Sequence, residues 1–137
     1  MDRGIALVGS GSATPSQILT NDQLGHRVDT SDSWIVSRTG ISERRVSAPE
    51  ESLVMLSHTA ASRALAMAKW DPGSIDLVLL ATSTPDDLFG SAPQVQAKLG
   101  ALNAVAFDLT AACSGFLFAL ITAAQYLRNG SMRRVLV

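Results

Sequence analysis

Residues 104–116 read AVAFDLTAACSGF and predict a strand that turns sharply into a helix. The apolar run over 104–109 is typical of a buried strand, and a long apolar helix begins near Cys113. A thiol at a helix N-terminus lies near unpaired N–H groups and the positive end of the helix dipole, which both favour the nucleophilic thiolate. Because small residues flank Cys113 on both sides, a substrate has room to approach it. We therefore take Cys113 as a candidate nucleophile, with a buried structural cysteine as the open alternative.

Strands and helices alternate on either side of this turn. We expect strands over 5–8, 75–81 and 104–109 and another that begins at Val135, with an exposed strand or extended arm over 41–46. We expect helices over 21–28, 34–38, 52–69, 91–100 and 114–129. Strands that are apolar throughout and separated by helices indicate an α/β fold, with a mostly parallel sheet covered on both faces. Ligand sites in such sheets lie at the carboxyl ends of strands, where Cys113 falls.

Local signals place the helix ends. Capping boxes predict helix starts at Thr20-x-x-Gln23 and Ser91-x-x-Gln94, and Ser31 or Asp32 is expected to cap the 34–38 helix. An apolar face on the 52–69 helix is formed by Leu53, Leu56, Ala60, Ala64 and Met67. The pair Gly9 and Gly11 lacks the remaining residues of a phosphate-binding loop, so we interpret it as a turn.

Composition narrows the class of protein. The chain has 137 residues, 47% of them hydrophobic and 17% charged, which suits one domain or part of one with a sizeable core. A formal net charge of −1 gives no electrostatic case for nucleic-acid binding. A single cysteine excludes an internal disulfide and a cysteine-cluster metal site, and it fits a cytoplasmic location. No apolar run is long enough to span a membrane, and the one at 5–8 is too short for a signal peptide.

The last residues, RRVLV at 133–137, look like the opening of a buried strand. We therefore expect residues 1–137 to be the N-terminal part of a longer protein. The alternative is a short edge strand at the end of the domain.

Four segments together resemble one family. They are TSDSWIVSRTGI at 30–41, ERR at 43–45, ATSTPD at 81–86 and DLTAACSGF at 108–116. In this order and spacing they are similar to β-ketoacyl-acyl-carrier-protein synthase III, a thiolase-like condensing enzyme. The first segment is quite specific to that family, whereas the last is shared with related condensing enzymes. The resemblance implies a thiolase-like fold, with residues 1–137 as its N-terminal half and the C-terminal half absent.

The resemblance also implies a reaction. An acyl group would pass from acyl-coenzyme A to a cysteine and then condense with malonyl-acyl-carrier protein, with loss of carbon dioxide. The product would be the first intermediate of fatty acid synthesis. The expected partners are acyl-coenzyme A as substrate, malonyl-acyl-carrier protein and a second copy of the protein, with no cofactor and no metal.

Site residues follow from the matched motifs. Cys113 matches the nucleophile, and its N–H matches one arm of the oxyanion hole. Trp34 and Arg38 match residues that bind coenzyme A through adenine stacking and a charge near the phosphates, and Thr39 beside them is a candidate hydrogen-bond donor. Phe89 matches a position that lines the acyl pocket of the partner subunit. The structural alternatives are core packing for Trp34, a solvated surface charge for Arg38 and local packing for Phe89.

The catalytic histidine and asparagine of the family have no match in these residues. His26 and His58 lie outside any family histidine motif, and Asn21, Asn103 and Asn129 do not match the asparagine. We therefore expect an incomplete active site and no turnover by the chain alone. Alternatives are a related starter-unit synthase of polyketide assembly and a binding or assembly fragment. A cysteine hydrolase is disfavoured, because no suitably placed histidine accompanies Cys113.

Overall fold

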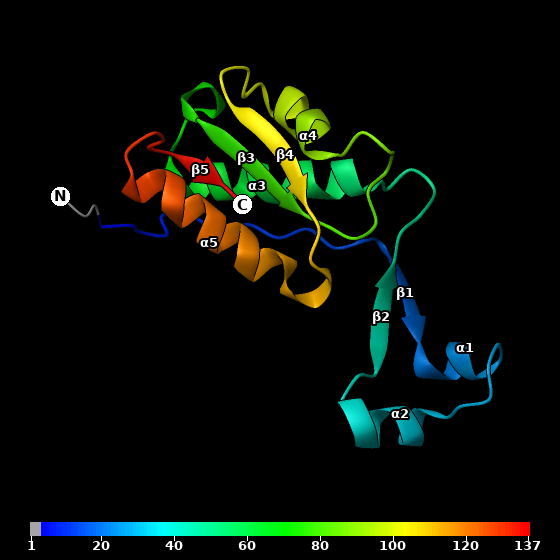
Figure 1. Cartoon of the computed structure of the whole chain (residues 1–137). Coiled ribbons are helices and arrows are strands. Elements are labelled where there is room, and N and C mark those ends of the chain that lie inside the picture. The colour runs from blue at the N-terminus through cyan, green and yellow to red at the C-terminus, as the bar shows by residue number, and fades with distance from the viewer. Residues whose placement is uncertain (1–3) are drawn as a thin grey trace. The chain divides into compact units, whose positions relative to one another are not determined.

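The computed structural model describes residues 4–137, which form two compact units. The sheet unit contains the N-terminal residues up to Ala13 together with Leu53–Val137. The hairpin unit contains Thr14–Ser52. Figure 1 shows the elements of each unit, which we describe separately.

The sheet unit is built on a three-stranded parallel sheet. Its strands are β3 (Leu77–Ala81), β4 (Val105–Leu109) and β5 (Val135–Leu136), in the order β4-β3-β5. Every residue of β3 pairs with β4, from Leu77 opposite Val105 to Ala81 opposite Leu109, whereas β5 pairs only with Leu77 and Val78. The predicted α/β class and the three strands from 75, 104 and 135 onward are therefore confirmed.

The middle strand is buried on both faces because its side chains alternate between two clusters. Val78 packs with Leu65, Ile75 and Ala101 on one face. Leu77 and Leu79 pack with Ala119 and Ala123 on the other. The second face is covered by α5 (Gly115–Arg128), and the first by α3 (Leu53–Ala68) and α4 (Ala92–Leu99). A strand covered in this way needs the continuous apolar run that the sequence displays.

Helix α3 is one residue shorter at each end than the predicted 52–69, and its most buried stripe differs from the predicted face. The buried residues are Val54, Ala61 and Leu65, whereas Met67 is 65% exposed. Ala60 and Ala64, on the predicted face, lie against the N-terminal residues instead. The helix is apolar on two sides because it packs on the sheet with one and on the chain's N-terminal segment with the other.

The predicted strand over 5–8 is not formed. Residues 4–15 carry no helix or strand, and Leu7 is 88% exposed. At Leu77 and Val78, β3 already has β4 and β5 on its two sides, which leaves no place for a further strand there. The segment instead runs along α3, where Gly9 and Gly11 approach the helix so closely that an added Cβ would collide with the carbonyls of Ala64 and Ala60. It lines a cavity of about 890 Å³ whose other walls come from α3, the sheet and α5.

The hairpin unit contains two strands and two short helices. Strand β1 (Gln17–Thr20) pairs antiparallel with β2 (Glu43–Val46). Of the two alternatives predicted for 41–46, an exposed strand or an extended arm, the strand is therefore confirmed, while β1 was not expected. Between them lie α1 (Asn21–Gly25) and α2 (Asp32–Thr39). The capping box of Thr20 and Gln23 is formed, Ser31 caps α2, and Gly40 ends it in the left-handed conformation. Helix α1 ends three residues earlier than predicted.

Candidate functional site

Cys113 lies on the turn that joins β4 to α5. The β3–β4 pairing continues past the strand ends, since Thr82 N donates to Leu109 O at 3.2 Å and Thr110 Oγ1 donates to Thr82 O at 2.8 Å. The chain then enters the single turn η2 (Ala112–Ser114), where Ala112 has a φ of 45°. Only two non-glycine residues in the described chain, Lys69 and Ala112, have positive φ. The residue before the cysteine therefore holds a strained backbone.

The thiol of Cys113 is exposed to solvent, so the structural alternative of a buried cysteine is wrong. Ser114 N donates to Ala111 O at 3.0 Å, which closes the turn, and Ser114 gives α5 no side-chain cap. Gly115 N, the first N–H of α5, donates to Ala112 O, so the turn continues directly into the helix. The dipole of a helix of this length favours negative charge at that end. Cys113 is exposed at that end of the helix, where a substrate carbonyl can reach it.

Asp108, the fourth residue of β4, organises the neighbouring loop. Its carboxylate accepts hydrogen bonds from Ser91 N at 2.8 Å and Ala92 N at 2.6 Å. The capping box predicted at Ser91 is therefore wrong: Ser91 Oγ accepts from Asp86 N at 3.0 Å, and Gln94 bonds to Asp87. A carboxylate from a distant strand has replaced the local cap. The sequence signal was a single acid within an apolar strand, which we did not interpret.

The same loop is fixed at its other side. Asp86 accepts from Leu53 N at 3.2 Å and Val54 N at 3.0 Å, which caps the start of α3. Phe89 N donates to Asp87 Oδ1 at 2.8 Å. This anchored loop holds two large apolar side chains in solvent, since Leu88 is 93% and Phe89 is 91% exposed. The local-packing alternative for Phe89 is therefore wrong.

In the hairpin unit, α2 carries the other predicted residues on its surface. Trp34 is 54% exposed, which rules out core packing, and the guanidinium carbon of Arg38 lies 4.7 Å from the centroid of its ring. This cation–π contact holds the aromatic face and the positive charge together. Thr39 is differently engaged: its hydroxyl donates to Ile35 O at 2.8 Å and accepts from Ile41 N at 3.1 Å. The hydroxyl proton of Thr39 is thus bonded within α2.

The two histidines lie apart from any such arrangement. His26 follows α1 in the hairpin unit, and His58 lies within α3. Among residues 4–137, no group of three or more potential metal ligands is brought together. In that same range, none of the helices combines the length and the apolar character that crossing a membrane requires.

Comparison with known sequences gives one consistent family. Residues 107–137 match the sequence model of 3-oxoacyl-[acyl-carrier-protein] synthase III. The β-ketoacyl-[acyl-carrier-protein] synthase III of Prochlorococcus marinus (strain MIT 9313) is 75% identical over 134 residues, which are 98% of this chain and 40% of that protein. The synthase III of Synechococcus sp. (strain WH7803) is 67% identical over the same shares. The chain thus spans about 40% of the length of the curated relatives it matches.

Solved structures agree with the fold. The 3-oxoacyl-[acyl-carrier-protein] synthase III of Aquifex aeolicus VF5 has a TM-score of 0.91 at 44% identity, over 93% of this chain and 42% of that one. The priming β-ketosynthase of the R1128 polyketide biosynthetic pathway has a TM-score of 0.90 at 38% identity, over 93% and 38%. The resemblance predicted from four short segments is therefore confirmed along almost the whole chain, which is similar to the N-terminal part of β-ketoacyl-[acyl-carrier-protein] synthase III and shares the thiolase-like fold.

Proposed function

We propose that this chain supplies the nucleophile and part of the coenzyme A site of a β-ketoacyl-acyl-carrier-protein synthase III. The observation that carries the proposal is the exposed thiol of Cys113, on a strained turn at the start of α5, in a chain 75% identical to a protein of that name. The rest of such an enzyme lies in the part of the relatives that this chain does not span.

The chemistry proceeds in two halves. Cys113 Sγ attacks the thioester carbonyl of acyl-coenzyme A, coenzyme A leaves as its thiol, and the acyl group remains on the cysteine as a thioester. Malonyl-acyl-carrier protein then loses carbon dioxide, and the resulting carbanion attacks the acyl carbonyl. The β-ketoacyl-carrier protein leaves, and the thiol of Cys113 is restored. The reaction needs no redox cofactor, because acyl transfer and decarboxylative condensation involve no net oxidation or reduction.

Each candidate site residue would have a role that follows from its position. The N–H of Cys113 and the start of α5 would stabilise the oxyanion that forms during attack. Trp34 would stack on adenine, and Arg38 would lie near the phosphates of coenzyme A. Thr39, whose proton is bonded to Ile35 O, would contribute chiefly by closing α2. Phe89, exposed on an anchored loop, would enter the acyl pocket of a second subunit.

The proposal extends to the protein's organisation. Residues 1–137 would act as the N-terminal half of a longer, homodimeric synthase, in agreement with their 40% share of the relatives. Its place would be the cytoplasm, where the acyl carrier protein and acyl-coenzyme A are found together. The R1128 priming enzyme shares the fold to the same degree, so a polyketide starter-unit synthase remains the second candidate.

A hybrid synthase tests the proposal. In it, this chain replaces the matching residues of the Prochlorococcus marinus (strain MIT 9313) protein. Incubation with a panel of acyl-coenzyme A thioesters should add one acyl group to the protein, measured by intact mass. Cys113→Ser should abolish the addition, because serine forms no comparable anion at neutral pH, whereas the neighbouring Ser114→Ala should acylate normally. Undiminished acylation of the serine variant would refute the assignment. A preference for primers and carriers of polyketide assembly would favour the second candidate.

A further inference from the structure

The hairpin unit encloses one polar side chain, Asn21, which is only 1% exposed. Asn21 is the first residue of α1 and follows the cap residue Thr20. Its backbone N–H donates to Ser42 O at 3.2 Å. A buried amide is costly unless its donors and its acceptor are all bonded, so its partners show what the residue holds.

The side chain of Asn21 uses both of its donors and its acceptor. Nδ2 donates to Asp32 Oδ1 at 2.8 Å and to Ile41 O at 2.7 Å. Oδ1 accepts from Arg44 Nη2 at 2.7 Å. Arg44 Nη1 in turn donates to Leu19 O at 3.1 Å, which ties the group to β1.

The two acceptors bonded by Nδ2 lie at opposite ends of α2. Asp32 is the first residue of that helix, and Ile41 follows Gly40, which ends it. Trp34 and Arg38 lie between them. Apolar packing contributes little to the orientation of α2, because Ile35 is its only buried residue. The hydrogen bonds of Asn21 therefore tie both ends of the helix to the rest of the unit.

We propose that Asn21 is a positioning residue for coenzyme A binding: it holds α2 so that the Trp34 ring and the Arg38 guanidinium are arranged before the ligand arrives. A preformed surface binds more tightly, because the ligand does not have to order it. This inference rests on the proposed coenzyme A role of Trp34 and Arg38. Asn21 itself touches no ligand.

Asn21→Asp is the sharpest test. The variant keeps the size of the side chain and an acceptor for Arg44, but it turns a carboxylate oxygen towards Asp32 Oδ1 and Ile41 O in place of the donor. In the hybrid synthase, we expect the KM for acyl-coenzyme A to rise about tenfold while kcat stays within about twofold, because the chemistry at Cys113 is untouched. In the 137-residue chain, amide exchange should accelerate over residues 32–41 and remain unchanged in α3 and α5.

Matched variants separate position from folding. Asp32→Asn keeps the acceptor oxygen and should leave KM unchanged. Combined with Asn21→Asp, it supplies a donor from the other side and should recover part of the loss. Asn103→Asp places the same new charge on an exposed residue of the sheet unit and should change neither KM nor exchange. If Asn21→Asp fails to fold, Asp32→Ala, which removes one exposed partner, should still raise KM about threefold.

The outcomes are distinct. Unchanged KM and unchanged exchange over 32–41 would overturn the positioning role. A fall in kcat as large as the rise in KM, together with general unfolding, would also overturn it. Trp34→Ala tests the underlying function separately. If it leaves KM unchanged in a folded protein, the coenzyme A role fails, and the exchange measurement alone decides whether Asn21 orders α2.

Discussion

At the scale of single residues, the strained backbone before the nucleophile is the most local feature of the site. Ala112 has a φ of 45° and an exposed side chain, so only its backbone conformation constrains what it can be. Ala112→Val should destabilise the chain by about 1–3 kcal/mol, because a β-branched residue is poorly tolerated at positive φ. Ala112→Gly should be close to neutral, since relief of strain is offset by greater freedom of the unfolded chain. Chemical denaturation measures both.

An ordinary exposed alanine supplies the control for this prediction. Ala66→Val lies on the exposed side of α3 and should cost only the helix propensity difference, below about 1 kcal/mol. Equal losses from Ala112→Val and Ala66→Val would show that the turn stores no strain.

At the scale of residues, the predicted site residues are those that a short motif identifies. Cys113, Trp34 and Arg38 stand in local strings, and the structure exposes all three, as binding or catalysis requires. Asp108 and Asn21 were missed because their partners lie 16 to 23 residues away or belong to other elements. Nothing in the neighbouring sequence shows that an acid in a strand caps a helix, or that an asparagine bonds both ends of another helix.

At the scale of elements, a carboxylate ties the two ends of the hairpin unit together. Glu51 Oε1 accepts from Ser16 N at 2.9 Å, and Oε2 accepts from Ala48 N at 2.9 Å. These bonds, that from Ala48 foremost, hold the pKa of Glu51 below its usual value, although desolvation opposes them. Because the folded pKa is the lower one, the contribution to stability is present above the ordinary carboxyl pKa and is lost as pH falls through the folded value.

Amide exchange as a function of pH tests this contact. Protection of Ser16 and Ala48, corrected for the intrinsic exchange rate, should fall in the acid range below the usual glutamate pKa. Glu51→Gln should lower that protection at neutral pH and remove its pH dependence. Glu50→Gln, a change at the exposed neighbouring residue, should behave like the unchanged chain. Protection that is independent of pH in the unchanged chain would contradict the assignment.

The N-terminal segment makes a second prediction at this scale. An added Cβ at Gly11 would lie 2.6 Å from Ala64 N and would collide with Ala60 O, whereas one at Gly4 meets nothing within 4 Å. Gly11→Ala should therefore displace the segment from α3, cost about 1–3 kcal/mol and increase proteolysis before residue 13. Gly4→Ala should change neither. Equal resistance of the two variants to protease would show that the segment is not held by the helix.

Element prediction failed where an apolar run had more than one possible destination. Residues 5–8 have the composition of a buried strand, but a strand can join a sheet only where an unpaired strand edge lies beside it. The glycines that follow fit against α3, and the sequence alone does not show which contact prevails. Strands 77–81 and 105–109 were predicted correctly, because helices cover both faces and leave no ambiguity in their pattern.

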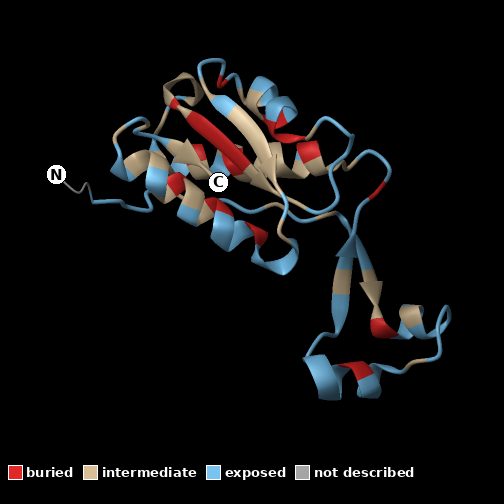
Figure 2. Ribbon diagram, viewed as in Figure 1, coloured by how far each residue is buried: buried red, intermediate tan, exposed pale blue. Residues whose placement is uncertain are grey.

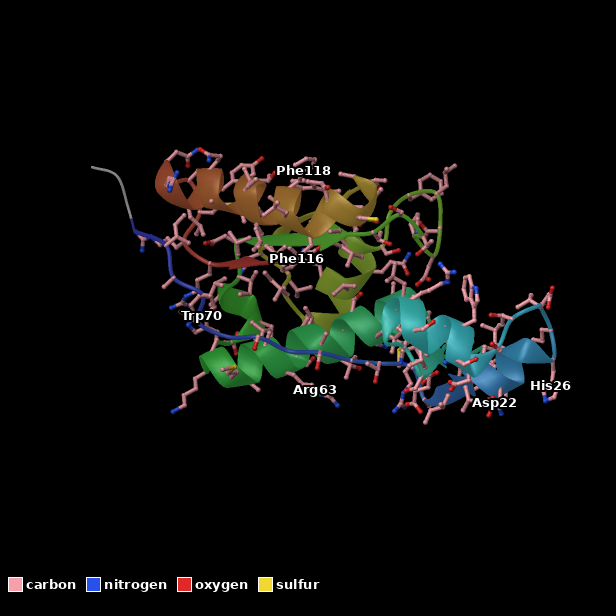
Figure 3. All side chains as sticks on the ribbon, turned by 90° about the horizontal axis from the view of Figure 1, so that it is seen from below. Asp22, His26, Arg63, Trp70, Phe116 and Phe118 are labelled. Carbon is pink, nitrogen blue, oxygen red and sulfur yellow. The ribbon has the colours of Figure 1, made fainter. Side chains whose placement is uncertain are left out.

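At the scale of the whole molecule, the outer face of α5 presents a group of exposed apolar side chains. Leu117, Phe118 and Ile121 are each about half exposed or more, and Figure 2 shows exposed, pale blue stretches along α5. Phe116 and Phe118 leave the helix on different sides in Figure 3, and Phe116 lines the cavity next to α3. Figure 3 shows the opposite side of α5 against the sheet. Exposed apolar patches of this kind usually contact another protein surface. About 60% of the relatives' length lies outside the matched residues, and we expect that part to supply the covering surface.

The last prediction compares the same substitution in two settings. Leu117→Lys and Ile121→Lys, one helical turn apart on α5, place charges on the exposed apolar face. In the 137-residue chain, which we expect to be oligomeric or poorly soluble, they should shift size-exclusion elution towards a monomer. In the hybrid synthase, where the face would be covered, they should lower the unfolding temperature, because a buried charge without a partner is costly. The unchanged chain should also fail to decarboxylate malonyl-acyl-carrier protein, since the family's histidine and asparagine have no match in it. A monodisperse monomer that turns this substrate over would contradict both the covered face and the divided active site.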